Sequence, residues 1–391
     1  DLLFNVKDGN IYYWDMNTDT LGTDRGTPLT LVSGADAATP TVATQVMVSD
    51  RDRHVLVFGC DPETAIGTQD PLLIRFSNQE SITEWAAEAT NTAGDLRVGS
   101  GSQIICAVET RQQVLVWTDV SLHAMQYLGP PFTFGIDQIS ENTTIAGPLA
   151  VKAVDDTVFW MGVEEFYIYT GQVQKLPCSV RSYVFNDFNV SQQELVTAGL
   201  NSSFSEIWWF YPSSSSTELD RYVVYNYEEK VWYYGTMTRT YWLDRGVNDY
   251  PLAANTDGYL YQHEFGLNDG TTTPASAISS YIQSSQLSIG EGEEFVFLNR
   301  LIPDLTFDAS TDATASVNMT LETRNYPGGQ YLQSNASAVT QTATTPVEQF
   351  TTEAYIRLRG RAFALKVDSS TIDIQWRLGS PRVEVRPDGR Q

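Results

Sequence analysis

Residues 206–234 read EIWWFYPSSSSTELDRYVVYNYEEKVWYY, and this stretch shows how the first two thirds of the chain are built. Three runs of aromatic and β-branched residues, 207–211, 222–225 and 231–234, are separated by a Pro-Ser-rich segment and by Asn-Tyr-Glu-Glu. Such side chains fit the pleated, half-buried surface of a β-sheet, whereas Pro, Ser and Asn mark turns. The stretch therefore predicts three short strands joined by turns.

Runs of the same kind occur throughout the first 270 residues, at 11–14, 54–58, 114–117, 158–161 and 166–169. The strand-and-turn unit restarts near Asp8, Asp52, Arg111, Asp156, Glu206 and Asp257. Four-stranded propeller blades repeat at about 40–50 residues, close to most of these intervals. The spacing predicts an all-β chain with a β-propeller-like body of roughly five to six blades over residues 1–270. An irregular β-sandwich is the alternative architecture.

Helix signals are few. Ser81-Ile82-Thr83-Glu84 and Ser191-Gln192-Gln193-Glu194 are capping-box patterns, in which the first side chain and the fourth satisfy each other's free backbone amides. The first predicts a short helix over 81–88. The second predicts a short helix that Gly199 can end.

The composition changes near residues 268–280, which are predicted to be a linker. Residues 281–391 contain strand-like runs at 295–298, 316–322, 354–358, 362–367 and 382–386. These runs predict a small C-terminal β-sandwich over 281–391. Residues 1–280 carry 14 Lys or Arg against 35 Asp or Glu, whereas residues 281–391 carry 10 against 13. Nearly all of the acidic excess is therefore in the first region.

The whole chain of 391 residues has 24 basic and 48 acidic side chains, for a formal net charge of −24. Tight binding of bare nucleic acid is not expected, because phosphate contacts require Lys and Arg on the contacting face. No run approaches the roughly 20 apolar residues of a membrane span. The sequence begins at Asp1, without a Met or a signal-like segment, so we expect it to be a piece of a longer chain.

The residues that most often carry chemistry are scarce. The three cysteines, Cys60, Cys106 and Cys178, are widely spaced and are expected to be core thiols of a protein assembled in a reducing cytoplasm. His54, His123 and His263 have no His or Cys partner at metal-ligand spacing. We therefore expect no metal, no cofactor and no histidine-based catalytic triad.

Two glycan-directed functions stay open as alternatives. Abundant carboxylates leave room for a propeller glycosidase or depolymerase that cuts host surface glycan, although no Ser-x-Asp-x-Gly box of sialidases is present. The run 207–211 could be a sugar-stacking platform of a propeller lectin, but such a run more often forms a strand that is buried on both faces.

One segment predicts a break in strand register. In residues 355–367 the apolar side chains occupy even positions before Gly360 and odd positions after it. A β-bulge at Gly360 to Ala362 would keep both halves facing inward. Arg357, Arg359 and Arg361 would then form a basic strip, which is either a solvated face or a possible subunit interface with acidic residues of a neighbour.

Several local sequences resemble one protein family. They are Leu73-Ile74-Arg75-Phe76-Ser77, Asn91-Thr92-Ala93-Gly94, Trp117-Thr118-Asp119, His123-Ala124-Met125-Gln126-Tyr127, Gly129-Pro130-Pro131-Phe132, Phe159-Trp160-Met161-Gly162, Leu176-Pro177-Cys178, Glu206-Ile207-Trp208-Trp209-Phe210-Tyr211-Pro212, Arg221-Tyr222, Trp376-Arg377-Leu378-Gly379 and Arg386-Pro387-Asp388-Gly389-Arg390. Over roughly residues 70–265 and the extreme C-terminus, the chain resembles the nozzle, or tail tubular (DNA-stabilisation), proteins of short-tailed bacteriophages. On this resemblance, we expect the usual N-terminal portion of that family to be missing from the sequence.

The resemblance implies a structural, non-enzymatic virion protein that is assembled in the host cytoplasm. Such proteins form a ring, expected to be a homohexamer, below the portal and the adaptor (head-to-tail connector) protein. Tail fibres or spikes attach around it. Genomic DNA is retained by the ring and passes through its channel on ejection without specific binding. A negative wall would repel phosphate and so discourage DNA from adhering.

Overall fold

The computed structural model describes residues 1–270, 272–289, 293–325 and 341–389. The chain divides into two compact units, Asp1–Glu264 and Phe265–Gln391. Strands dominate both, and α1 (Arg181–Asp187) is the single α-helix of the described residues. Three short 3₁₀ helices accompany it: η1 (Leu29–Leu31), η2 (Glu63–Ala65) and η3 (Val190–Leu195). The all-β prediction is confirmed.

The first unit contains six antiparallel sheets, and each is a meander of consecutive strands. The first sheet is β1 (Leu2–Asn5), β2 (Ile11–Trp14) and β3 (Thr27–Pro28). The next two sheets contain β4 (Ala43–Val48), β5 (Val55–Cys60), β6 (Leu73–Phe76) and β7 (Gly94–Arg97), and then β8 (Ile104–Glu109), β9 (Val114–Thr118), β10 (Ser121–Gly129) and β11 (Thr133–Glu141). The fourth sheet contains β12 (Val151–Val154), β13 (Thr157–Met161), β14 (Phe166–Tyr169) and β15 (Val173–Lys175). The fifth contains β16 (Thr197–Asn201), β17 (Glu206–Tyr211), β18 (Arg221–Asn226) and β19 (Val231–Thr236). The last sheet is β20 (Tyr241–Leu243), β21 (Leu252–Ala254) and β22 (Leu260–Gln262).

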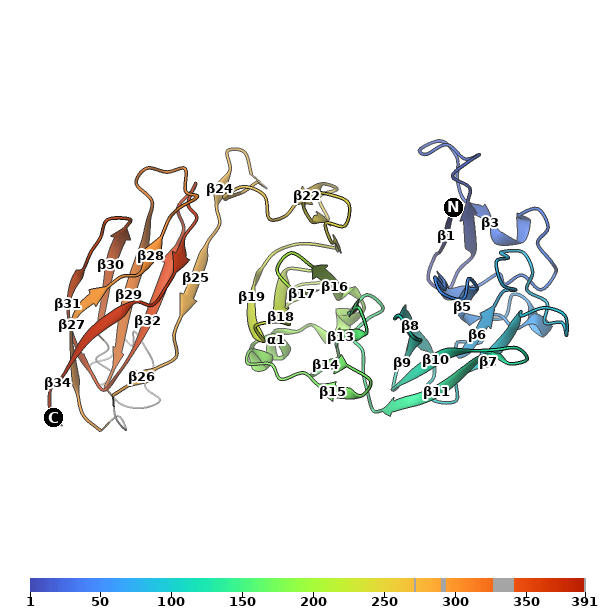
Figure 1. Ribbon diagram of the computed structural model, residues 1–391, viewed down its shortest axis with the longest axis horizontal. Coiled ribbons are helices and arrows are strands. Elements are labelled where there is room, and N and C mark those ends of the chain that lie inside the picture. The colour runs from blue at the N-terminus through green and yellow to red at the C-terminus, as the bar shows by residue number, and fades with distance from the viewer. Residues whose placement is uncertain (271, 290–292, 326–340, 390–391) are drawn as a thin grey trace. The chain divides into compact units, whose positions relative to one another are not determined.

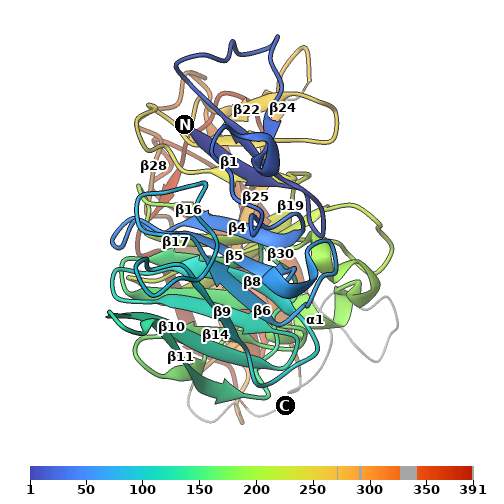
Figure 2. The same ribbon diagram turned by 90° about the vertical axis from the view of Figure 1, so that its right-hand side faces the viewer.

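The first strands of these sheets contact one another in series, from β1 through β4, β8, β12 and β16 to β20. Figure 1 shows the six sheets following one another around a common centre, and Figure 2 shows the first two from their side, with β1 above β4 and β5. First strands at the centre and later strands outside define propeller blades. The β-propeller-like body of five to six blades is therefore confirmed. The predicted restarts at Asp52, Arg111 and Asp156 each lie in the turn between the first and second strands of a sheet.

Large aromatic side chains hold neighbouring sheets together. Trp117 of β9 and Trp160 of β13 pack edge to face, with ring centroids 5.4 Å apart. The Nε1 of Trp209 in β17 donates to the Ala150 carbonyl, 3.0 Å away, just before β12. All six residues of β17 are buried, so 207–211 is a core strand and not an exposed stacking platform.

The first predicted helix does not form, and the second is a helix of another type. Residues 81–88 form an irregular segment with bends, because the backbone amides of Trp85 and Ala86 donate to Asp36 Oδ2, at 2.6 and 2.9 Å, and the Trp85 ring is buried. The second segment is the 3₁₀ helix η3, which ends before β16. Gly199 lies inside β16, where a Cβ would come within 2.5 Å of the Trp242 ring, so it permits close packing of two sheets and does not end a helix.

The second unit is a β-sandwich. One sheet has the order β25 (Ser280–Gln283), β32 (Ala362–Ser369), β29 (Ser316–Arg324) and β30 (Thr342–Glu348), and β26 (Leu287–Ser288) also pairs with β32. The other has the order β31 (Ala354–Gly360), β27 (Val296–Ile302) and β34 (Arg382–Pro387). Inward side chains of both sheets form one apolar core, which includes Leu298, Met319, Leu358 and Val367. The predicted small C-terminal sandwich is confirmed.

Small two-stranded sheets complete this unit: β28 (Leu305–Thr306) with β33 (Arg377–Leu378), and β23 (Asn268–Asp269) with β24 (Ser276–Ala277). The last pair occupies the predicted linker near 268–280. Asn268 also bonds to Asp373 through its side chain, at 2.6 Å to the Asp373 carboxylate and 2.7 Å from the Asp373 amide. This segment therefore folds as part of the second unit, and the division between the units falls earlier, after Glu264.

The register break at Gly360 exists, but a β-bulge is the wrong explanation for it. The strand that ends at Gly360 belongs to one sheet of the sandwich, and the strand that begins at Ala362 belongs to the other. Changing sheets reverses which side faces the core, so buried positions are even in β31 and mainly odd in β32. A Cβ at Gly360 would lie 2.6 Å from Thr323 Cβ, which explains why glycine occupies the crossing point.

Candidate functional site

A cavity of about 150 Å³ lies at the centre of the first unit. Its lining comes from turns, strand ends and the 3₁₀ helix η3: Lys7, Asp8, Thr44, Gln103, Ile104, Ile105, Asp119, Thr144, Ile145, Ala146, Gly147, Pro148, Val163, Gln193 and Glu194. Because segments of five successive strand-and-turn units contribute to it, the cavity is an axial pocket of the propeller-like body. We call it the axial pocket.

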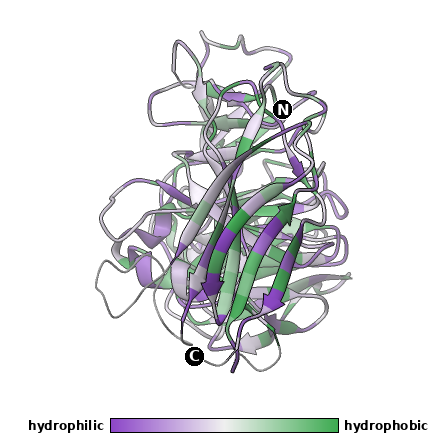
Figure 3. Ribbon diagram, turned by 90° about the vertical axis from the view of Figure 1, so that its left-hand side faces the viewer, coloured by the Kyte–Doolittle hydropathy of each residue, from purple (hydrophilic) through white to green (hydrophobic). Residues whose placement is uncertain are grey.

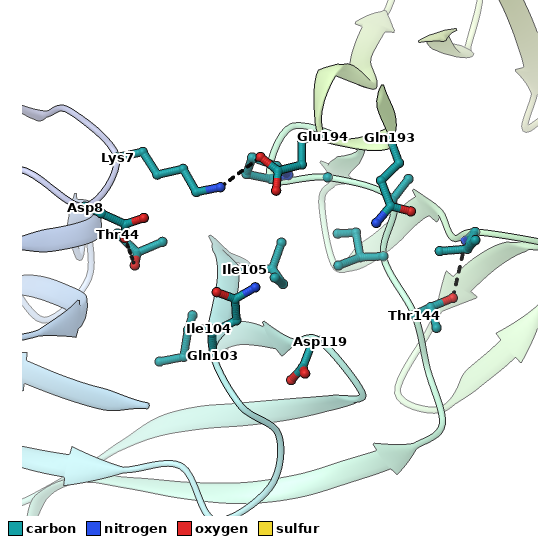
Figure 4. Close-up of a pocket in the computed structure, with 15 residues that line it drawn as sticks. Lys7, Asp8, Thr44, Gln103, Ile104, Ile105, Asp119, Thr144, Gln193 and Glu194 are labelled. Carbon is teal, nitrogen blue, oxygen red and sulfur yellow. Dashed lines mark hydrogen bonds and ion pairs between the residues drawn. The ribbon is translucent and has the colours of Figure 1, made fainter. Parts of the chain in front are cut away.

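Charge is uneven in the axial pocket, since Lys7 is the one base beside three acids, Asp8, Asp119 and Glu194. Figure 4 shows Lys7 reaching across the pocket towards Glu194, with Asp119 on the opposite side. The Lys7 Nζ to Glu194 Oε2 distance is 3.0 Å, and both side chains are more than half exposed. An ion pair this exposed contributes at most about 1 kcal/mol, so it can open at little cost.

The other acids are held by neighbouring donors. Asp119 accepts from the Ser102 backbone amide at 2.8 Å and from the Ser102 hydroxyl at 2.7 Å. Partial burial opposes ionisation of Asp119, but these hydrogen bonds prevail and lower its pKa. Asp8 accepts from Thr44 Oγ1 at 2.8 Å. The Oε1 of Gln193 is buried and has no hydrogen-bond partner among the described residues.

This arrangement is suited to binding a small ligand. The pocket wall presents carboxylates and amide oxygens, which suit a small ligand rich in N–H donors, and its described lining contains no His, Cys or Ser. Sequence reasoning missed the axial pocket. Its residues have no common motif, and they occupy different positions in successive repeats, so the sequence carried no signal for them.

Each histidine is structural. His54 is fully buried, with Nε2 3.0 Å from Thr92 Oγ1, and burial lowers its pKa. His123 is also buried, with Nε2 2.9 Å from Ser121 Oγ, and burial lowers its pKa. Burial, and then the nearby Arg239 guanidinium that donates to its Nε2, lower the pKa of His263 to about 4. All three rings are therefore neutral at pH 7.

The cysteines are free thiols, of which Cys60 and Cys106 are buried and Cys178 is partly buried. Burial raises the pKa of the Cys60 thiol to about 12. It also raises the pKa of Cys178 to about 11. Thiolate is the reactive form, so these thiols are poorly suited to nucleophilic roles.

A buried carboxyl that the sequence reasoning did not single out lies in β17. Glu206 is 9% exposed, and its oxygens accept from Trp208 Nε1 at 3.1 Å and from Tyr233 Oη at 2.8 Å. Burial raises the pKa of Glu206 more than these hydrogen bonds lower it. The pKa of Glu264 is also raised, first by desolvation and then by the negative charge of Glu206. Both oxygens of Glu206 are occupied within the protein, so its role is structural.

The predicted arginine strip lies on the outer face of the second unit's three-stranded sheet. Arg357 is exposed, whereas Arg359 pairs with the Asp388 carboxylate and lies over the Phe295 ring, 4.1 Å from its centroid. Arg361 also lies over Phe295, at 4.9 Å. The structure thus brings Arg359 and Arg361 together around one aromatic ring, and Arg357 lies on the same face of β31 as Arg359.

Among the described residues, no group of three or more His, Cys, Asp or Glu side chains could hold a metal ion. Over the same residues, no helix is both long and apolar enough to span a membrane.

Comparisons with known proteins give no family. No family model matches the chain, and no curated protein matches it. Among solved structures, the N-terminal domain of Nup159 is similar at a TM-score of 0.25 and 8% identity, over 80% of this chain and 60% of that domain. A Saccharomyces cerevisiae complex of Dbp5, Nup159 and Gle1 gives 0.30 and 11%, over 83% of this chain and 88% of the matched chain. The tricorn protease gives 0.17 and 10%, over 86% of this chain and 40% of its own. Similarity this low carries no argument about function.

Proposed function

We propose that the chain is a structural subunit of the ring-shaped nozzle of a short bacteriophage tail. The observation that supports this most directly is that the first and last sheets of the propeller-like body each expose an apolar face. Continuous apolar surface of this kind marks a site of protein–protein contact.

The exposed face of the first sheet follows from strand alternation. Leu3 packs into the core and Asn5 bonds to the β4 backbone, so Leu2, Phe4 and Val6 point the other way. They are 55%, 38% and 64% exposed. Phe4 also stacks on Tyr12 of β2. The apolar side chains of β1 and β2 thus continue one another across this face.

The last sheet repeats the pattern. Trp242 of β20 is buried against Trp208, whereas its neighbours Tyr241 and Leu243 are half exposed. Leu260 is 73% exposed and shares the face of Tyr241, because both pair with Ala254. Among the described strands, no contact like those within the series joins β20 to β1. Sheets of a propeller pack face to face, so two uncovered end faces favour a subunit that is completed by its neighbours.

In the proposed nozzle the subunit contacts copies of itself, the adaptor protein and the tail fibres or spikes, and DNA crosses the lumen. A hexamer would carry a formal charge of −144, which opposes adhesion of DNA phosphate to the wall. The propeller gives the proposed ring a rigid body, since buried tryptophans pack between its sheets.

Electron microscopy of the native particle tests the proposal. Particles that carry this chain with a small C-terminal tag should show antibody label around the short tail, below the portal, with ring symmetry. Label on the capsid shell or on detached fibres, or a chain absent from purified particles, would contradict the proposal.

Substitutions test the apolar faces themselves. Phe4→Glu and Leu243→Glu should each remove the chain from assembled tails, because a charge in the contact cannot be desolvated. Val247→Glu is the matched control, because Val247 is fully exposed in the turn after β20. It should assemble normally. Equal incorporation of all three variants would mean that these faces are not contacts.

A further inference from the structure

The outer face of the sheet β31-β27-β34 concentrates positive charge on an otherwise acidic chain. Strand pairing aligns Arg359, Phe297 and Arg386 across the three strands, and then Tyr355, Arg300 and Glu384. Arg357 lies between these rows on β31, and Arg382 pairs with Ile302 at the end of β34. We call these five arginines, Arg300, Arg357, Arg359, Arg382 and Arg386, the arginine face.

Alternation explains how the arginine face forms. The intervening side chains on the same strands, such as Leu298, Leu358 and Val385, enter the sandwich core, so the residues between them face outward. On β27 a register shift between Leu298 and Arg300 keeps Arg300 aligned with the outward residues of both neighbouring strands. In Figure 3 hydrophilic and hydrophobic bands accordingly alternate along strands of the second unit.

Three carboxylates are set among the arginines. Arg300 Nη1 lies 2.9 Å from Glu353, and Arg300 Nε lies 3.1 Å from Glu384. Arg386 pairs with the same Glu384 at 2.7 Å, and Arg359 pairs with Asp388. Five guanidiniums against three carboxylates leave a formal charge of +2 on this face.

Two guanidiniums have no internal partner. Arg357 and Arg382 are exposed, and their guanidiniums make no ion pair or hydrogen bond to any residue that the structure describes. Arginine suits bidentate pairing with carboxylates, and it is less strongly hydrated than lysine, so it enters interfaces at lower cost.

We infer that the arginine face docks on the acidic first unit of a second copy of this chain. Residues 1–264 carry 14 basic and 34 acidic side chains, a net charge of −20, whereas residues 265–391 have a net charge of −4. The arginine face and the first unit are thus complementary in sign, which favours encounter and fixes orientation. This inference deepens the proposed ring and rests on it.

Nucleic acid is the less suitable partner for the same surface. Phosphates would approach Glu353, Glu384 and Asp388 together with the arginines, and the chain as a whole carries −24. A protein surface can place carboxylates at Arg357 and Arg382 and still avoid the three acids, because its charges are discrete and fixed in position.

Self-association of the full chain tests the inference. Sedimentation at 50 and 500 mM NaCl should show association that weakens with salt. Arg357→Glu and Arg382→Glu should each raise the dissociation constant about tenfold or more at 50 mM NaCl, and Arg357→Lys should have a smaller effect. Arg377→Glu is the matched control. Arg377 is an exposed arginine of the same unit, and its guanidinium also makes no ion pair within the described part of the chain, but it lies on β33, outside the arginine face, so its replacement should change little.

Each other outcome contradicts the inference. A chain that stays monomeric, or an association equally sensitive to Arg377→Glu, would overturn it, as would duplex DNA binding that Arg357→Glu abolishes. Unchanged melting temperatures show that the variants fold. Microscopy of the particle is independent of this result. A labelled tail whose subunits associate without Arg357 would refute the arginine contact alone, whereas an unlabelled tail would refute the nozzle.

Discussion

At the scale of single residues, Arg75 shows how this propeller-like body uses buried charge as a structural link. Its side chain is 2% exposed, and its guanidinium donates to three backbone carbonyls: Ala38 at 2.5 Å, Asp61 at 3.2 Å and Trp85 at 3.3 Å. These three carbonyls lie in loops, outside the hydrogen-bond ladders of the sheets. One forked side chain therefore satisfies three separate segments.

Arg75→Ala should destabilise the first unit by about 3 kcal/mol, because it leaves three buried carbonyls unpaired. The expected signal is a fall of about 6–12 °C in the melting temperature, measured by tryptophan fluorescence. Arg97→Ala removes an exposed arginine paired with Asp70 and should cost less than about 1 kcal/mol. Equal losses in the two variants would show that Arg75 is not a link.

Glu206 gives the first unit a pH dependence of known sign. A carboxyl whose folded pKa is raised binds its proton more tightly in the folded state. Its contribution to stability is therefore complete below the unfolded pKa of about 4.3 and is lost as pH rises through the folded pKa. Glu264 has the same direction of shift and lies within reach of this charge.

Glu206→Gln should raise the melting temperature at pH 7.5, because it removes a buried charge. Its advantage over the wild type should shrink steadily as pH falls to 4. Glu229→Gln, in the exposed turn between β18 and β19, should leave the profile unchanged. A Glu206→Gln effect that is the same at every pH would indicate packing and not ionisation.

At the scale of elements, the crossing from β31 to β32 explains the second unit. The chain leaves one sheet at Gly360 and enters the other at Ala362, and the Arg361 amide bonds to the Arg324 carbonyl at 2.8 Å. The glycine lies where the backbone passes close to Thr323 and Arg324. Arg361 is thus the single residue that connects β31 in one sheet of the sandwich to β32 in the other.

Gly360→Ala should destabilise the second unit by about 1–3 kcal/mol, since the added methyl overlaps Thr323 and the backbone of Arg324. Scanning calorimetry of the full chain should show one transition lowered and the other unmoved. Gly270→Ala has open space around its Cβ and serves as the control. An unchanged melting profile for Gly360→Ala would mean that the crossing can relax.

At the scale of the whole molecule, charge is divided between the units: the first is strongly acidic and the second carries the arginine face. The chain should therefore bind duplex DNA poorly even in 50 mM salt, with a dissociation constant well above micromolar in a mobility-shift titration. Micromolar or tighter binding that falls steeply with salt would contradict a lumen wall that repels DNA.

The sequence by itself determined the strands and the two folded parts. Runs such as 207–211 and 231–234 form strands because their aromatic and β-branched side chains pack well on the pleated surface of a sheet. The change of the apolar positions from even to odd at Gly360 also predicted the register break. These properties depend on neighbours a few residues apart, which a sequence displays directly.

Only the tertiary structure decided how distant segments meet. Residues 81–88 carry a capping box, yet Asp36 takes their amides and the Trp85 ring enters the core, so no helix forms. The axial pocket is lined by segments of five strand-and-turn units, and Arg382 meets the strip of Arg357 and Arg359 only through strand pairing with β27. The bulge was wrong for the same reason. Local register shows that a strand must turn over, but which sheet receives it depends on contacts between residues far apart in the chain.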